Sequence, residues 1–173
     1  MALINESADE DPLPCPAWVW SNISNIHVAK DRSWFGDDYT PFNSYCLIEG
    51  HPITVIGIGT VDLPVKLGPS SHGTLHLENV LHVPDMLCNI IGDILTHGYG
   101  ISNNRFIELS TKQTVAYLTL HYGLYVVLLS EFPHGPKVGP SPFGGTMNNL
   151  IGISWPEPER MRFEAVKRLL VAL

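Results

Sequence analysis

Residues 18–129 consist of short apolar runs separated by glycine, proline, asparagine and aspartate. Runs of this length between turn-forming residues predict β-strands rather than helices. Residues 74–81 alternate between apolar and polar side chains, as a half-buried strand does. Gly57 and Gly59 interrupt another apolar segment, and glycine inside a strand is typical of a bulge where a sheet curls. We therefore expect a mainly β fold with a strongly curved sheet.

Changes in composition divide the chain into four parts. Residues 1–17 are rich in acidic residues and proline, so we expect a flexible leader there. Residues 18–130 carry the strand signals and form the β-domain. Residues 131–156 mix proline with glycine, as a linker or an extended strap does. Residues 157–173 have helical periodicity and are expected to form a terminal helix.

The terminal helix is amphipathic, with Pro158 and Glu159 in its first turn, where both are favourable. Its apolar residues at helical spacing are Met161, Ala165, Val166, Leu169 and Leu170. We expect this helix to dock on its own β-domain and to bury Leu169 and Leu170; the alternative is a helix that binds a partner. A second, short helix is expected at residues 90–95, ended by Gly98.

Charge and composition exclude several classes of function. Ten Lys and Arg residues stand against 17 Asp and Glu residues, giving a net charge of −7, so a nucleic-acid partner is not expected. The chain has no apolar run of about 18 residues that would predict a membrane span. A signal-peptide pattern is absent at the start, which favours a cytoplasmic location. Three widely spaced cysteines and a loose group of histidines predict neither disulfides nor a metal site.

One segment carries a specific resemblance. Residues 77–86 read Leu-Glu-Asn-Val-Leu-His-Val-Pro-Asp-Met. They resemble the Leu-x-Asn-Val-Leu-His-Val-Pro-x-Leu signature of copia-type retrotransposon polyproteins. Residues 89–91 (Asn-Ile-Ile) and 57–61 (Gly-Ile-Gly-Thr-Val) are similar to two further motifs of that family, in the right order. The resemblance covers residues 18–129 and implies a retropepsin-like β-barrel, the aspartic protease domain of such elements.

The catalytic triplet of that family is missing. Where the family has Asp-Ser-Gly, this chain has Ser21-Asn22-Ile23, between residues 18–20 (Trp-Val-Trp) and His27. An aspartic protease needs a carboxylate in this place as general base, and a serine hydroxyl does not replace it at neutral pH. We therefore expect a retropepsin-like barrel with one short internal helix and a C-terminal amphipathic helix, but without proteolytic activity.

The segment that replaces the catalytic loop is the candidate site. It offers hydroxyl, amide and imidazole groups, and an aromatic-rich stretch follows it that could line an apolar cavity. The candidate catalytic residues, as hydrogen-bond or proton donors, are Asn22, Asn25, His27 and Tyr45. The candidate ligand-binding residues are Trp20, Ser21, Trp34, Phe35, Tyr39 and Phe42. The alternative is that most of these aromatic side chains belong to the core and that His27 is structural.

Two classes of function fit these features. The first is a repurposed barrel that binds a hydrophobic small molecule and promotes a cofactor-free cyclisation or isomerisation, such as an intramolecular Diels–Alder step in secondary metabolism. This function requires no cofactor and no metal. The second is a catalytically dead module that forms a homodimer or binds another protein. An inert transposon fragment is a third alternative. An enclosed apolar cavity would favour the enzyme, and a filled barrel with an apolar edge would favour the module.

Overall fold

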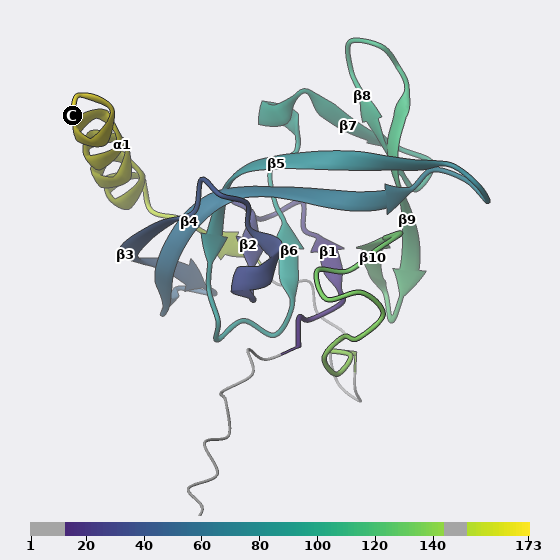
Figure 1. The fold of residues 1–173 in the computed structure, drawn as a ribbon, viewed down its shortest axis with the longest axis horizontal. Coiled ribbons are helices and arrows are strands. Elements are labelled where there is room, and N and C mark those ends of the chain that lie inside the picture. The colour runs from purple at the N-terminus through teal and green to yellow at the C-terminus, as the bar shows by residue number, and fades with distance from the viewer. Residues whose placement is uncertain (1–12, 144–151) are drawn as a thin grey trace, which may run out of the picture.

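A computed structural model describes residues 13–143 and 152–173, and these form a mainly β domain with one long helix (Figure 1). The strands are β1 (Trp18–Trp20), β2 (Val28–Ala29), β3 (Thr40–Ile48), β4 (His51–Lys66), β5 (His72–His82), β6 (Asn89–Ile91), β7 (Tyr99–Ser102), β8 (Arg105–Glu108), β9 (Thr114–His121), β10 (Leu124–Val127) and β11 (Ile153–Ser154). The helices are the 3₁₀ turns η1 (Arg32–Trp34) and η2 (Leu95–His97) and the α-helix α1 (Glu157–Val171).

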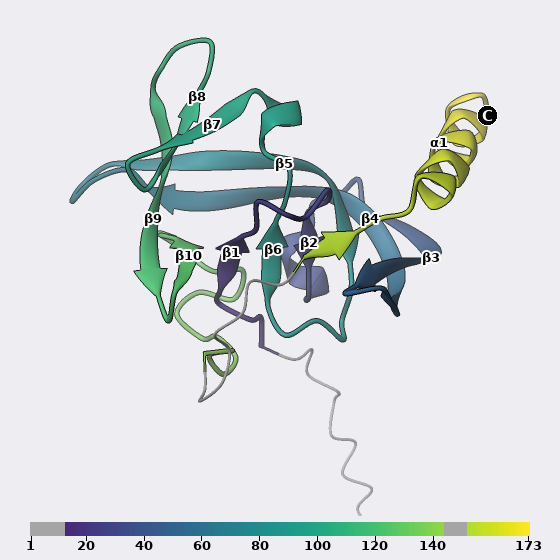
Figure 2. The same ribbon diagram turned by 180° about the vertical axis from the view of Figure 1, so that it is seen from behind.

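All the strands belong to one sheet in the order β11-β3-β4-β5-β2-β6-β1-β10-β9-β8-β7. The long β4–β5 hairpin crosses the molecule and connects its two ends (Figures 1 and 2). The end of β4 also bonds to the segment after β10: Lys66 N donates to Leu128 O at 3.0 Å and Ser130 N to Pro64 O at 3.0 Å. Since β4 and β10 lie far apart in the strand order, these bonds curl the sheet back on itself. The expected mainly β, barrel-like fold is confirmed.

The curled sheet holds two apolar clusters. The first lies toward β3 and the C-terminal segment and includes Val28, Cys46, Ile90, Ile153 and Phe163. The second lies around the far half of the β4–β5 hairpin and includes Trp18, Leu63, Leu75, Leu77 and Phe106. Alternation along the strands explains the division, because residues of one strand that face opposite sides enter different clusters.

The expected helix at residues 90–95 is wrong in part. Asn89–Ile91 is strand β6, which pairs in parallel with β1, and both Ile90 and Ile91 are buried. Only one 3₁₀ turn follows, and Gly98 ends it with a φ of +78°. β-branched side chains in a buried position favour the strand, and the partner strand comes from the start of the chain.

The helix α1 begins at Glu157, but its docking differs from the prediction. Phe163 is its buried residue and packs against Phe42 and Trp155, with ring centroids 5.2 and 6.1 Å apart. Leu169 and Leu170 are 69% and 56% exposed, so their expected burial is wrong. The helix projects away from the barrel (Figure 1), and Phe163 and the partly buried Val166 are its residues that pack against the first cluster.

Parts of the expected leader and strap are ordered elements. Residues 1–12 and 144–151 lie outside the described residues. At the end of the leader, Cys15 and Ala17 are buried, and Cys15 N donates to Asp31 Oδ2 at 2.7 Å. At the end of the strap, Ile153–Ser154 pairs with β3 as strand β11. Among the described residues, no helix is long and apolar enough to cross a membrane.

Candidate functional site

The loop between β1 and β2 replaces the catalytic triplet, and the C-terminal segment of the chain packs against it. Ser21 is fully buried, and its N–H donates to Ile91 O at 2.9 Å. Ser24 Oγ donates to Ser21 Oγ at 2.8 Å and accepts a hydrogen bond from Ile153 N at 2.9 Å. The two hydroxyls therefore connect the loop to strand β11.

Asn25 extends this connection by one residue. Its side-chain Nδ2 donates to Trp155 O at 3.2 Å, and its Oδ1 accepts from Trp155 N at 2.8 Å. The amide thus pairs with both backbone groups of Trp155, as a neighbouring strand would. Asn22 and Asn25 are both exposed residues, and what distinguishes Asn25 is the pair of hydrogen bonds to Trp155. The loop that we expected to orient a substrate holds the chain's own C-terminal segment.

His27 is a buried, neutral residue. Its Nδ1 accepts a hydrogen bond from Gly92 N at 2.9 Å, and its ring lies 4.8 Å from that of His97. Burial, and then the neighbouring His97, lower the pKa of His27 to about 3. A pKa this low does not favour the predicted role of His27 as a proton donor near neutral pH. A structural role, which was the alternative, fits its contact with Gly92.

The structure does not gather the predicted aromatic residues into one wall. Trp34 and Phe35 are buried in the second apolar cluster, whereas Phe42 is buried in the first. Trp20 packs against Phe106 and Tyr125 from the second cluster's side of β1. Tyr45 lies on β3 and is 41% exposed. The aromatic residues therefore serve two separate cores, because a curled sheet turns successive residues to different interiors.

The remaining predicted residue, Tyr39, is the centre of a cluster made by the sequence motifs. Its hydroxyl shares a hydrogen bond of 2.8 Å with His82 Nδ1. A Cβ atom on Gly57 would lie 2.2 Å from that hydroxyl, and one on Gly59 would lie 3.2 Å from the Phe35 ring. The two glycines of the Gly-x-Gly motif thus leave room for Tyr39 and Phe35 to lie over β4. The two glycines of the motif therefore have a structural role.

A β-bulge completes this arrangement. The β4–β5 ladder shifts register by one residue at Thr60, which lies opposite Glu78 and Asn79. Asn79 has a φ of +53°, a conformation that asparagine adopts more readily than most residues. Thr60 donates from its N and Oγ1 to the Asp38 carboxylate at 3.1 and 2.6 Å. Burial would raise the pKa of Asp38, but the hydrogen bonds from Thr60 hold it below its ordinary value.

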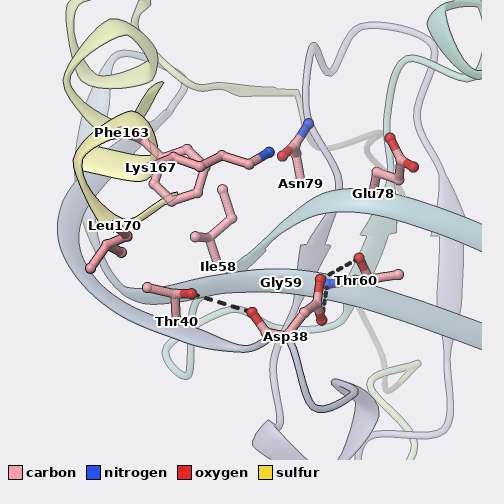
Figure 3. A pocket seen from close by; sticks show the side chains of 10 residues that line it. All are labelled: Asp38, Thr40, Ile58, Gly59, Thr60, Glu78, Asn79, Phe163, Lys167 and Leu170. Atoms are coloured by element: carbon pink, nitrogen blue, oxygen red, sulfur yellow. Dashed lines mark hydrogen bonds between the residues drawn. The ribbon is translucent and has the colours of Figure 1, made fainter. Parts of the chain in front are cut away.

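A groove of about 330 Å³ separates α1 from this bulge (Figure 3). Ile58, Phe163 and Leu170 provide apolar side chains, and Lys167 extends from α1 toward Asn79. Carboxylates also line the groove, so charges of both signs face it. Such a mixed lining does not select one charge of ligand. The groove marks where contact between α1 and the barrel ends.

The face of α1 that points away from Phe163 is a second apolar surface. We call this surface the outer stripe; it consists of Pro158, Met161, Ala165, Leu169 and Ala172. All five residues are exposed, and consecutive members are three or four positions apart in the sequence. The prediction of a single apolar face is therefore wrong. On a helix of 3.6 residues per turn, Phe163 and Leu170 lie on one side, and Met161 and Leu169 lie on the opposite side. The helix is therefore apolar on both sides but covered on one.

A metal centre is not formed by the described residues: within them no three His, Cys, Asp or Glu side chains come close enough to share an ion. His76 lies on the surface between Asp62 and Glu78. The hydrogen bond to Asp62 raises the pKa of His76. The three cysteines are free and buried.

Comparison with known families decides what the barrel is. Residues 18–99, just under half of the chain, match the family model of the Pol polyprotein, beta-barrel domain. These residues are similar to that family, which supports a barrel derived from a retrotransposon polyprotein. Searches of curated proteins and of solved structures gave no match. The Pol β-barrel domain is the barrel of a retrotransposon polyprotein, as the resemblance implied.

The matched region contains the whole Tyr39 cluster and the loop at Ser21. It ends at Tyr99, so that β8 to β11 and α1 lie outside it. The Pol β-barrel domain of this chain is therefore completed by a segment that the family model does not include. The hydrogen bonds from Ser24 and Asn25 join the two parts.

Two asparagines of the loop provide a matched test of this joint. We expect Asn25→Ala to lower the free energy of unfolding by about 1–3 kcal/mol, because the Trp155 N–H and C=O lose their partners. Asn22→Ala should change it by less than about 0.5 kcal/mol, since Asn22 is exposed like Asn25 but its side chain has no hydrogen bond to Trp155. Urea unfolding followed by circular dichroism measures both. Equal effects of the two substitutions would contradict a specific role of Asn25.

Proposed function

We propose that this chain is a non-proteolytic Pol β-barrel module that forms a homodimer through the outer stripe of α1. The observation that carries the proposal is a helix with apolar residues on both sides, of which only the Phe163 side is covered. Met161 and Leu169 are 65% and 69% exposed. Seven of the fifteen residues of α1 are charged, and its exposed outer stripe is free of charge, so this stripe favours contact with a partner.

The outer stripe is self-complementary, which favours a second copy as that partner. Its five residues are arranged symmetrically about Ala165: Met161 and Leu169 lie four residues from it, Pro158 and Ala172 seven. In an antiparallel pair with a two-fold axis at Ala165, Met161 of one copy meets Leu169 of the other. The small Ala165 side chains meet at the axis and allow the helices to approach closely. Isologous dimers require this kind of symmetry.

Charges beside the stripe fit the same arrangement. Glu164 and Arg168 lie on one flank of the stripe, on either side of Ala165 along the helix. The two-fold axis keeps this flank on the same side of both helices. Glu164 of one copy therefore comes beside Arg168 of the other, twice in each dimer. Such flanking pairs set the orientation of paired helices.

The replaced catalytic loop supports a function without proteolysis. Ser21 stands where the protease family has its aspartate, and it is buried against Ser24 rather than open to a substrate. The cofactor-free cyclisation or isomerisation of a hydrophobic molecule stays a prediction. It has less support, because the expected substrate loop is engaged with Ile153 and Trp155.

Sedimentation equilibrium of the whole chain tests the dimer. We expect a species of twice the 19.1 kDa chain mass at concentrations up to about 100 µM, a range that covers micromolar dimers. Met161→Glu with Leu169→Glu should raise the dissociation constant more than about tenfold, because the charges would be buried at the interface. Leu109→Glu with Leu120→Glu, at exposed positions of the barrel, is the control.

A charge exchange tests the antiparallel orientation. Arg168→Glu alone should weaken the dimer, and Glu164→Arg added to it should restore much of the affinity. A chain that remains a monomer throughout the concentration range would overturn the proposal. So would a dimer that the double substitution at Met161 and Leu169 leaves unchanged.

A further inference from the structure

A second cleft lies on a different part of the barrel, between η1, the turn after β5 and residues 133–140. Its volume is about 790 Å³. Its apolar lining comes from Leu13, Pro84, Pro133 and Pro140. Three of these four side chains are prolines, so the lining is stiff. A cleft with rigid apolar walls and a few polar groups is the usual form of a small-molecule site.

Two cations line this cleft, and neutral groups hold both of them in place. Lys30 Nζ donates to the Met86 carbonyl at 2.8 Å. The Arg32 guanidinium lies over the Tyr39 ring, 4.0 Å from its centroid, and NH1 lies 3.4 Å from the Phe35 carbonyl. Within the described part of the chain, neither cation lies within ion-pair distance of a carboxylate. Among the described residues Arg162 is the one Lys or Arg side chain in an ion pair, so Lys30 and Arg32 stand out by their fixed positions in the cleft and not by the lack of a carboxylate.

A hydroxyl group next to Arg32 in the sequence, that of Ser33, also lacks a partner. Ser33 Oγ is buried and has no hydrogen bond among the described residues, and Ser33 lines the same cleft. A buried polar atom without a partner costs about 1–3 kcal/mol, so such atoms usually face a ligand or an ordered water. An acceptor atom near Arg32 would satisfy it.

Two of the remaining polar groups of the cleft, Asp31 and His82, are already engaged by hydrogen bonds. Asp31 is 8% exposed and accepts the Cys15 N–H. Burial raises the pKa of Asp31, while that hydrogen bond, Lys30 and His134 act in the opposite direction. His82 is bonded to the Tyr39 hydroxyl. Asp31 is the one carboxylate among the residues that line this cleft, and its field is partly offset by these neighbours.

We infer that this cleft binds a small organic acid, with a carboxylate on an apolar body. The carboxylate accepts hydrogen bonds from the Arg32 guanidinium and the Ser33 hydroxyl, and the body lies against Pro84 and Pro133. Arg32 suits this role because a guanidinium binds a carboxylate through two parallel N–H groups. The inference is independent of the dimer, since none of these residues belongs to α1.

Isothermal titration calorimetry of the whole chain with three probes tests the inference. We expect phenylacetate to bind, acetate to bind more weakly because it lacks the apolar body, and phenethylammonium, a cation of similar shape, not to bind. Arg32→Gln should weaken phenylacetate binding by about tenfold or more, since charge-assisted hydrogen bonds are lost. Lys66→Gln, an exposed cation at the end of β4, should have no effect.

Ser33→Ala separates a binding role from a structural one. Removal of an unpartnered buried hydroxyl should leave the melting temperature unchanged or higher, while phenylacetate affinity falls several-fold. A lower melting temperature with unchanged affinity would mean that Ser33 serves the fold. Binding of phenethylammonium as tight as that of phenylacetate, no binding of phenylacetate, or unchanged affinity in Arg32→Gln would overturn the inference.

Discussion

Gly92→Ala should leave little folded protein. A Cβ atom at this position would lie 2.2 Å from the Ile26 carbonyl oxygen and 2.7 Å from its carbonyl carbon. Both are backbone atoms, and the Gly92 N–H is also bonded to His27, so neither segment can move aside without losing contacts. We expect a loss of about 4 kcal/mol or more in the free energy of unfolding, against a typical total of about 5–15 kcal/mol.

Urea unfolding, or the soluble yield where unfolding is complete, measures this effect. Gly68→Ala is the control, because the nearest atom to its Cβ would be Ser71 Cβ at 3.8 Å. We expect a change within about 0.5 kcal/mol for that variant. A Gly92→Ala protein as stable as the control would mean that the loop at Ile26 does not lie against β6 as described.

The second large effect is expected for Trp155→Ala. Trp155 is 2% exposed, packs against Phe163 and donates from its indole N–H to Ser44 Oγ at 3.1 Å. Removal of a buried tryptophan side chain costs about 3–5 kcal/mol. The loss should lower the melting temperature by more than any exposed substitution does.

Differential scanning calorimetry of Trp155→Ala beside Leu120→Ala, whose side chain is 62% exposed, provides the comparison. Hydrogen exchange adds a local measurement. In Trp155→Ala the amides of Asn25 and Ile153, which are bonded to the C-terminal segment and the loop, should exchange faster. A melting curve that matches that of Leu120→Ala would show that the C-terminal segment does not stabilise the barrel.

The strands of the barrel were predictable because their signals are local. Alternation in residues 74–81 indicates a half-buried strand, observed as β5, without reference to the rest of the chain. Strand β6 was missed because its partner, β1, lies about seventy residues earlier. A three-residue apolar segment has no periodicity of its own, so only that pairing decides between strand and helix.

The candidate site was harder to predict for the same reason. Asn25 offers an amide to any partner, and the one that it finds is Trp155, 130 residues away. Whether Leu169 and Leu170 are buried depends on how far the barrel extends beneath α1. The periodicity of the helix carries no information on that distance. The cleft beside Arg32 could not be predicted from the sequence, because the groups that position its two cations are known only from three-dimensional contacts.

The joint between the first loop and the last strand has a consequence for synthesis of the protein. The first apolar cluster includes Val19 and Val28 but also Ile153 and Phe163, which the ribosome adds more than a hundred residues later. A nascent chain that ends before Ile153 exposes Cys46 and Val55 and leaves Asn25 without its partner. Contacts so distant in sequence form slowly, and unfinished barrels of this kind present apolar surface to chaperones and to one another. The barrel is therefore expected to close only after the ribosome has added Ile153 and Phe163.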